Sequence, residues 1–225
     1  MRSAGWMYRP WGGVYHRRPM GALIALEGID GSGKSTQARV LRDALEARGV
    51  AAVVFREPGD SEPGERLREL FAHGRSVSPE KEMHLFIEDR RIDVRDNILP
   101  ALAAGTTVVM DRYYFSTMAY QGALGIDPEE IRAVNEAFAP RPDLTLILDL
   151  PAPTSAARIR RSRGATDSFE EVDYLRRVRE LFASFVAADV VLIDADRPEA
   201  EVAAAIWAEV EPLLRTKGKL PRDMT

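Results

Sequence analysis

The sequence predicts an α/β domain in which helices flank a mainly parallel sheet of five strands. Five short runs of consecutive apolar residues are spread along the chain, as in strands that are buried on both faces of a sheet. Longer segments of helical pattern separate these runs, and this alternation is typical of parallel strands joined by right-handed crossovers. Ligands of such a domain gather at the carboxyl ends of the strands.

Each expected strand is a run of mainly Ala, Val, Ile and Leu. The strands are expected at residues 22–28, 51–57, 106–112, 144–150 and 189–195. Helices are expected at residues 34–48, 64–73, 79–104, 128–138, 153–163, 169–187 and 197–214. Polar residues that end buried strands are candidates for function, because they reach the ligand-binding edge of the sheet.

Composition restricts the classes of function. The 225 residues fit one domain with a sizeable core, and the net charge of −4 gives no basic field for binding nucleic acid. There are no cysteines, and the three histidines are not spaced like metal ligands, which argues against a disulfide framework or a zinc site. No apolar run is long enough to span a membrane and nothing resembles a signal peptide, so a soluble cytoplasmic protein is expected.

The chain is expected to divide into a domain at residues 21–214 with a short segment at each end. Residues 1–20 are rich in Gly, Pro, Arg and aromatic residues without any period, and are expected to form a disordered extension. Met20 directly precedes the first strand, so a start assigned too far upstream is an equal alternative. Residues 215–225 are expected to form a polar C-terminal tail.

A phosphate-binding loop follows the first strand. The stretch "GIDGSGKS" from Gly28 to Ser35 has the spacing G-x-x-x-x-G-K-[ST] and lies between a strand and a helical pattern, which makes the match specific. Its backbone N–H groups can hold phosphate oxygens, Lys34 adds a cation, and the Ser35 hydroxyl can bind Mg²⁺. ATP is therefore expected on nine consecutive residues: Gly28, Ile29, Asp30, Gly31, Ser32, Gly33, Lys34, Ser35 and Thr36. The fold is expected to be a three-layer sandwich of the P-loop NTPase type.

The third apolar run ends in "MDR", which places Asp111 and Arg112 beside this loop. Asp111 is expected to bind Mg²⁺ together with Ser35, the alternative being a residue that caps the strand end. Arg112 could likewise form a surface ion pair. Asp30 is unexpected, because it puts a negative charge inside a loop that must hold a polyanion.

An arginine-rich segment, "RIRRSRGATDSFE", occupies residues 158–170. Like charges spaced three and four apart on a helix repel one another unless anions neutralise them. The segment is therefore expected to form a lid that brings guanidinium groups over the transferring phosphate. Arg161 and Arg163 are favoured for this role over Arg158, because they lie nearest the turn at Gly164. A solvated basic face is the alternative.

Phe86 and Arg90 are four residues apart and so share one face of a helix, as an aromatic plate beside a bidentate donor. With these residues the chain resembles the thymidylate kinase family over residues 21–214. The motifs occur in the same order: "EGIDGSGKST" is similar to the phosphate loop, "REPG" to the second-strand motif and "FIEDR" to the base-reading helix. "DRY" and "STMAYQG" are similar to the motifs that follow, and "RPDLTLILDL" to the strand before the lid.

This resemblance implies transfer of the γ-phosphoryl group of ATP to dTMP with Mg²⁺, in a protein that typically forms homodimers. It implies that Phe86 contacts thymine, that Arg90 binds the base carbonyl, and that Thr117 or Gln121 meets the base edge. Arg56 and Arg112 would hold the acceptor phosphate, Tyr120 would lie near the deoxyribose, and Asp30 would reach its 3′-hydroxyl or a magnesium-bound water. The residues implied to bind dTMP are Asp30, Arg56, Glu57, Phe86, Arg90, Arg112, Ser116, Thr117, Tyr120 and Gln121. Those implied to act in catalysis are Asp30, Lys34, Arg112, Arg161 and Arg163.

Three positions depart from the family pattern. Asp60 and Ser61 stand where the family commonly has Gly and Thr, and Ser168 stands where an arginine is common. An additional carboxylate beside an acceptor phosphate is unexpected. Another nucleoside or deoxynucleoside (mono)phosphate kinase therefore stays open as an alternative, as does a catalytically weak ATP-binding protein.

Overall fold

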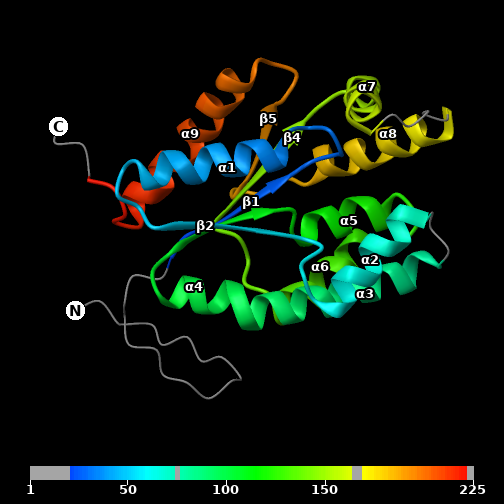
Figure 1. Cartoon of the computed structure of the whole chain (residues 1–225), viewed down its shortest axis with the longest axis horizontal. Helices are drawn as coiled ribbons and strands as arrows, with labels where there is room; N and C mark the ends of the chain where they lie inside the picture. The colour runs from blue at the N-terminus through cyan, green and yellow to red at the C-terminus, as the bar shows by residue number, and fades with distance from the viewer. Residues whose placement is uncertain (1–20, 74–76, 164–168, 222–225) are drawn as a thin grey trace.

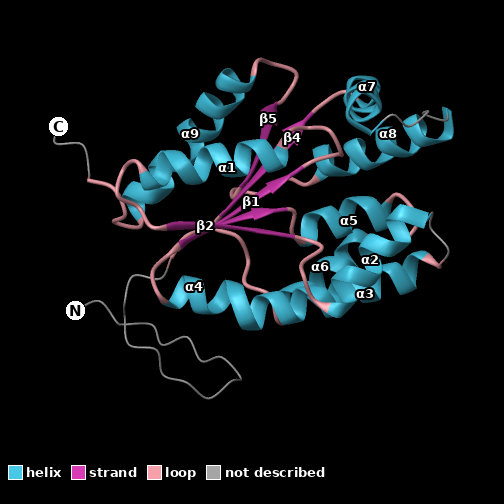
Figure 2. Ribbon diagram, viewed as in Figure 1, coloured by secondary structure: helices cyan, strands magenta, loops and turns pink. Residues whose placement is uncertain are grey.

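The computed structural model describes residues 21–73, 77–163 and 169–221. It contains a five-stranded parallel sheet with helices on both faces (Figures 1 and 2). The strand order is β2-β3-β1-β4-β5. The predicted α/β fold of the P-loop NTPase type is confirmed. The strands are β1 (Leu23–Glu27), β2 (Ala52–Arg56), β3 (Thr107–Asp111), β4 (Leu144–Asp149) and β5 (Val190–Asp194).

The helices cover both faces of this sheet. Helices α1 and α9 pack against each other on one face, while α4 and α8 contact strands from the other (Figure 1). The helices of the described chain are α1 (Lys34–Glu46), α2 (Glu62–His73), α3 (Pro79–Asp93), the π-helix η1 (Val94–Ile98), α4 (Leu99–Ala103), α5 (Tyr114–Gly122), α6 (Pro128–Glu136), α7 (Ala152–Arg163), α8 (Phe169–Ser184) and α9 (Glu199–Thr216).

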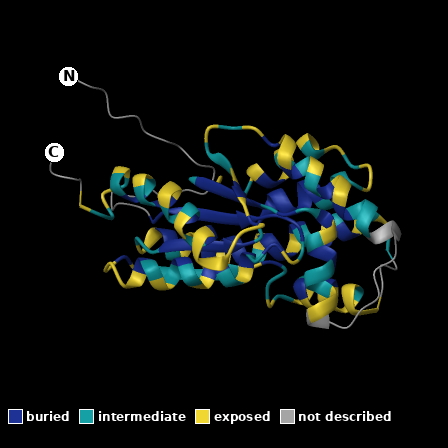
Figure 3. Cartoon of the chain, turned by 90° about the horizontal axis from the view of Figure 1, so that it is seen from above, coloured by how far each residue is buried: buried dark blue, intermediate teal, exposed yellow. Residues whose placement is uncertain are grey.

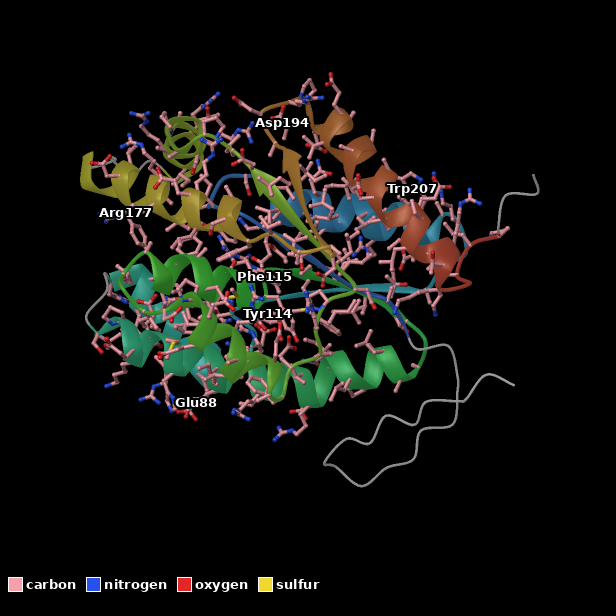
Figure 4. All side chains as sticks on the ribbon, turned by 180° about the vertical axis from the view of Figure 1, so that it is seen from behind. Glu88, Tyr114, Phe115, Arg177, Asp194 and Trp207 are labelled. Carbon is pink, nitrogen blue, oxygen red and sulfur yellow. The ribbon has the colours of Figure 1, made fainter. Side chains whose placement is uncertain are left out.

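Helix α5 lies in a segment for which the sequence predicts no helix. Most of its residues are buried, including the aromatic pair Tyr114 and Phe115, whose ring centroids lie 4.8 Å apart (Figure 4). A helix that is buried on all sides has no polar face and so lacks the 3.6-residue apolar period. The predicted helix at residues 79–104 is present, with the π-helical turn η1 between α3 and α4.

The core is centred on β1, in which every residue is buried, and the neighbouring strands β3 and β4 are also buried almost throughout, while the edge strands β2 and β5 are partly exposed (Figure 3). Parallel register aligns the carboxyl ends of neighbouring strands, with Leu26 opposite Asp111 and Arg56 also opposite Asp111. The last residues of β1, β2 and β3 therefore share one edge. This edge carries the polar residues from which the candidate site is built.

The C-terminal segment contacts the opposite edge of the sheet. Helix α9 continues to Thr216, and the Lys217 Nζ lies 2.7 Å from a carboxylate oxygen of Asp143. The other oxygen of Asp143 accepts the Leu23 N–H at 2.8 Å. The first residues of the predicted tail at 215–225 are therefore attached to the start of β1. Residues 1–20, the predicted extension, lie outside the described residues. Among the residues that the structure describes, no helix is long and apolar enough to cross a membrane.

We expect Ile24→Ala to destabilise the fold strongly, because Ile24 is fully buried in the central strand. Truncating a buried isoleucine to alanine typically costs about 2–5 kcal/mol in the free energy of unfolding. Urea denaturation followed by circular dichroism measures this quantity. Leu192→Ala is the matched control on the edge strand β5, where the side chain is exposed, and its cost should be below about 1 kcal/mol. Equal losses in the two variants would contradict the central position of β1 in the core.

Candidate active site

A cavity of about 950 Å³ opens at the carboxyl ends of β2 and β3. Its walls come from β2 and the following loop, from α3, and from α5, and Asp30 of the phosphate-binding loop borders it. All ten residues predicted to bind dTMP line this one cavity: Asp30, Arg56, Glu57, Phe86, Arg90, Arg112, Ser116, Thr117, Tyr120 and Gln121. Because they come from separate parts of the sequence, the fold is what brings them together.

Glycines are required in the loop between β1 and α1 for two reasons. Gly28 has φ 131°, and a Cβ atom there would lie 2.5 Å from the Leu148 carbonyl oxygen. Gly31 has φ 74°, and its Cβ would lie 3.1 Å from the carbonyl oxygen of Ser155 on α7. Close approach and left-handed backbone together exclude larger residues. The loop leads directly into the amino terminus of α1, where backbone N–H groups and the helix dipole favour the binding of phosphate.

Lys34 lies under this loop. Its Nζ donates to the carbonyl oxygens of Gly28 at 2.9 Å and Ile29 at 2.7 Å, and to the Ser32 hydroxyl at 3.3 Å. Burial lowers the pKa of Lys34 to about 7, and the nearby Arg112 guanidinium acts in the same direction. An anion beside this ammonium group would favour its charged form.

Ser35 and Asp111 meet at the start of α1. The Ser35 hydroxyl donates to Asp111 Oδ2 at 2.5 Å, and Arg56 Nε lies 3.8 Å from the same oxygen. A hydroxyl and a carboxylate are the hard oxygen ligands that Mg²⁺ prefers, and this ion usually takes its remaining ligands from water and phosphate. Among the described residues no group of three or more His, Cys, Asp or Glu side chains could hold a metal. The pair thus fits an ion bound largely by nucleotide phosphates.

Arg112 connects the loop to the cavity. It is the only non-glycine residue of the described chain with a positive φ, at 74°, a conformation that is costly for a long side chain. This backbone directs the guanidinium between Asp30 Oδ1, at 2.5 Å, and the Ser116 hydroxyl, at 2.9 Å. The Tyr120 ring lies beneath it, with its centroid 5.1 Å from the guanidinium carbon. Because it is held on several sides, the Arg112 guanidinium stays in one position, which suits the binding of an anion at a defined place.

Glu27 is a site residue that sequence reasoning missed. It ends β1 fully buried, and its carboxylate accepts the Tyr113 N–H at 2.8 Å and the Ser116 hydroxyl at 2.5 Å. It therefore holds both the turn that carries Arg112 and the serine that contacts Arg112. Burial raises the pKa of Glu27 to about 7. The signal in the sequence was a carboxylate at the end of a wholly apolar strand.

Arg90 lies at the inner wall of the cavity, fully buried. Its guanidinium is bound by the Glu57 carboxylate, with Nε 2.9 Å from both oxygens, and Nη2 donates to Thr117 Oγ1 at 3.1 Å. Nη1 donates to Asn135 Oδ1 at 2.6 Å. Asn135 of α6 is a second residue that the sequence analysis missed, because nothing in the sequence links α6 to the other motifs. Most of the N–H groups of Arg90 thus donate to other side chains of the protein.

The remaining cavity residues form an aromatic and polar wall. Phe86 is half-buried, and its ring centroid lies 6.1 Å from that of Phe71. The amide of Gln121 donates to Glu82 Oε1 at 2.8 Å, while its own oxygen has no hydrogen-bond partner among the described residues. The Tyr120 hydroxyl accepts the Asp30 N–H at 3.0 Å. This wall offers a flat apolar surface next to a buried acceptor.

Helix α7 places Arg158 at the phosphate-binding loop, not the favoured Arg161. Arg158 Nη1 donates to the Gly31 carbonyl oxygen at 3.3 Å, and its Cβ packs on Gly31. The exposed Arg161 donates instead to the carbonyl oxygen of Ala157 on its own helix, at 3.3 Å. Proximity in sequence to the turn at Gly164 therefore did not identify the arginine that contacts the loop. The Arg163 side chain, like Ser168, lies outside the described residues.

Asp60, the unexpected carboxylate, is among the residues that line the cavity. Its side chain is fully exposed and lies 3.6 Å from Arg68 Nη1. The neighbouring Ser61 donates to Asp89 Oδ1 at 2.5 Å and accepts the Gly64 N–H at 3.1 Å, so it caps the amino terminus of α2. The departure from the family pattern thus supplies a helix cap and an exposed charge.

Comparison with known proteins identifies the family. The family model described as thymidylate kinase matches residues 26–206. A protein of Archaeoglobus fulgidus named "Probable thymidylate kinase" is 46% identical over 195 residues, which are 87% of this chain and 97% of that protein. The chain belongs to the thymidylate kinase family. A thymidylate kinase of Akkermansia muciniphila is 48% identical over 186 residues, covering 83% of this chain and 89% of the other. One of Xanthomonas oryzae pv. oryzae is 47% identical over 178 residues, covering 79% and 78%.

The predicted resemblance to the thymidylate kinase family is therefore confirmed. Its matched region, residues 26–206, contains β1 to β5 apart from the first three residues of β1, and so includes the whole cavity wall. Of the motifs that carry the resemblance, the cavity gathers residues of "REPG", "FIEDR", "DRY" and "STMAYQG", together with Asp30 of the phosphate-binding loop.

We expect Glu27→Gln to change how the stability of the nucleotide-free protein depends on pH. The neutral form of Glu27 is favoured in the folded state, so its contribution is full below pH 4.5 and is lost as the pH rises through about 7. The free energy of unfolding of the wild type, relative to Glu27→Gln, should fall between these values by at most about 1.4 kcal/mol per pH unit. Denaturant titrations of both proteins from pH 4.5 to 7.5 measure it. A difference that stays constant across this range would show that folding does not raise the pKa of Glu27.

Proposed function

We propose that this protein transfers the γ-phosphoryl group of ATP to dTMP, giving dTDP and ADP for the synthesis of dTTP. One observation carries the proposal: the ten predicted acceptor residues line a single cavity, and that cavity meets the phosphate-binding loop at Asp30. Transfer between two nucleotides needs the two sites to be adjacent, with the reacting groups aligned. Membership in the thymidylate kinase family supports the choice of acceptor.

On the donor side, the backbone of Gly28 to Thr36 would bind the phosphates of ATP. Lys34 would leave part of its hydrogen bonding with the loop carbonyls to meet the β- and γ-phosphates, whose charge restores its full ionisation. Ser35 and Asp111 would hold Mg²⁺, which neutralises charge on the phosphates when bound.

On the acceptor side, Phe86 would stack on thymine, while Arg90 and either Thr117 or Gln121 would bind its polar edge. The Gln121 oxygen, which has no hydrogen-bond partner within the described part of the chain, is a buried acceptor suited to a ring N–H. Tyr120 would lie against the deoxyribose, where a 2′-hydroxyl would be crowded.

The acceptor phosphate would lie between Arg56 and Arg112, near the last residues of β2 and β3. Ser116 supports the phosphate contact through Arg112, and Glu57 supports the base contact through Arg90. The Asp30 carboxylate, which now contacts Arg112, is close enough to the cavity to bind the 3′-hydroxyl or a magnesium-bound water.

The chemistry needs no general base. A phosphate monoester has a second pKa of about 6, so at neutral pH the attacking oxygen of dTMP is already ionised. Catalysis then consists of bringing two anions together and stabilising the charge that develops between them. Lys34 and Arg112 are positioned for this between the loop and the cavity, and Arg161 and Arg163 of the lid would add charge from α7.

The proposed setting is the cytoplasm, and the proposed assembly is a homodimer. The supply of dTTP requires a protein with access to ATP and free nucleotides. The family typically assembles through helices beside the acceptor site. Size-exclusion chromatography with light scattering tests the dimer.

The decisive experiment is an ADP-release assay with a panel of nucleoside monophosphates and thymidine. Activity dependent on dTMP, and far above that with dCMP, dAMP or thymidine, is the expected result. Preference for another monophosphate would assign the protein to a different kinase activity. ATP binding without acceptor-dependent ADP release would show a catalytically weak protein.

Lys34→Ala is expected to lower kcat by a factor of about 10² to 10³, because it withdraws a preorganised positive charge from the phosphates. Steady-state kinetics at saturating ATP and dTMP measure this. Lys217→Ala is the control: it removes a partly buried lysine that contacts Asp143 at the other edge of the sheet, and kcat should stay near that of the wild type. A Lys34→Ala protein with wild-type kcat would overturn the assignment of the loop.

Asp30→Ala is expected to raise the KM for dTMP by about tenfold, since a lost hydrogen bond to a charged group costs about 1.5–3 kcal/mol. The KM for ATP should change by less than about twofold. Measuring both constants separates the two sides of the loop. A loss confined to ATP would contradict the acceptor-side role of the carboxylate.

A further inference from the structure

The position of Arg90 is fixed from three separate elements. Glu57 follows β2, Thr117 belongs to α5 and Asn135 belongs to α6, and each binds a different part of the guanidinium. The ring of Tyr113 lies against the same group, with its centroid 5.4 Å from the guanidinium carbon. Arg90 is therefore held at its edges and supported on one face.

A count of donors shows what is left for a ligand. A guanidinium has five N–H groups. The Nε–H and one Nη2–H of Arg90 bind Glu57, and the second Nη2–H binds Thr117. One Nη1–H binds Asn135. Within the described chain a single N–H, on the nitrogen that Asn135 holds, remains for the cavity that Arg90 lines.

Asn135 presents its oxygen to Arg90 for a structural reason. Its own NH₂ group donates to the Ile131 carbonyl oxygen at 2.8 Å, one turn earlier in α6, which leaves Oδ1 directed to Nη1 at 2.6 Å. The side chain is fully buried and is not part of the cavity wall. Asn135 thus contacts Arg90 without itself lining the cavity.

We infer that Asn135 is a positioning residue for base selection: it fixes the Nη1 group of Arg90 so that one N–H meets a carbonyl of the acceptor base. This inference rests on the proposed function. A single fixed donor suits the 4-carbonyl of thymine and opposes the 4-amino group of cytosine, which is itself a donor. Without Asn135, Nη1 would have two unbound N–H groups, and the guanidinium could tilt about its contact with Glu57.

Asn135→Ala in the full-length protein tests the inference. Loss of the positioning bond should raise the KM for dTMP about 10- to 50-fold, or about 1.4–2.3 kcal/mol, and lower the preference for dTMP over dCMP in kcat/KM. The kcat and the KM for ATP should stay within about twofold, because the phosphate-binding residues are untouched. Asn135→Asp keeps an oxygen acceptor at the same place and should retain most of the preference for dTMP.

Two controls separate positioning from a purely structural role. Ile131→Val truncates a buried side chain on the same face of α6, and should lower the melting temperature without changing the preference for dTMP. In an Arg90→Lys background, Asn135→Ala should have no further effect on that preference, because the group that it positions is gone. A lower melting temperature with unchanged kinetics for Asn135→Ala would overturn the inference. So would equal kinetic effects of Asn135→Ala and Ile131→Val.

If the proposed function is wrong, the kinetic measurements on the wild-type protein show it independently of the variants. If the wild-type protein prefers another monophosphate, the choice of dTMP as substrate is wrong. The same variants, measured on the preferred nucleotide and its closest base analogue, then decide the role of Asn135. Should Asn135→Ala fail to fold, Asn135→Ser takes its place, because the shorter serine side chain does not reach Nη1 whereas that of Asn135→Asp does. Selectivity of Asn135→Ser equal to that of the wild type would overturn the inference.

Discussion

The ion pair between Asp30 and Arg112 joins the two halves of the site. Asp30 belongs to the loop that follows β1, and Arg112 follows β3, so the contact spans the two adjacent strands at the centre of the sheet. Through this pair the loop that would hold ATP and the cavity that would hold dTMP share a boundary. The negative charge in the phosphate-binding loop, unexplained by the loop alone, is balanced by a cation from the neighbouring strand.

Arg112 can occupy this position because other groups offset the strain of its backbone. Glu27 binds the N–H of Tyr113 and the hydroxyl of Ser116, and Ser116 in turn accepts from Arg112. The cost of a left-handed arginine is of the order of 1–3 kcal/mol, and several buried hydrogen bonds are sufficient to offset it. The carboxylate at the end of the central strand thus supports an arginine that it does not contact directly.

Much of this arrangement could be predicted from the sequence. The strands were visible because apolar runs in a parallel sheet are continuous, and the loop and cavity residues were visible because their motifs keep fixed spacing. Helix α5 was not predicted, since a helix buried on all sides has no amphipathic period. Asn135 and Glu27 were missed for another reason: they act through other side chains, and only the three-dimensional fold shows those contacts. Arg158 was ranked below Arg161 on its distance in sequence from the turn at Gly164. That distance does not show which side of a helix faces the loop, and it is Arg158 that contacts the loop.

The burial of helix α5 restricts how the substrate preference of this protein can change in evolution. Ser116, Thr117 and Gln121 line the cavity, yet all three are buried, and they alternate with the core residues Phe115, Met118 and Ala119. A substitution that altered which base is accepted would therefore also disturb packing between the sheet and its neighbouring helices. New substrate preference in this chain would have to arise together with compensating stability elsewhere. The side chain of Asp60, by contrast, is fully exposed, so a change at this position, one of those where the sequence departs from the pattern of its family, carries no such cost.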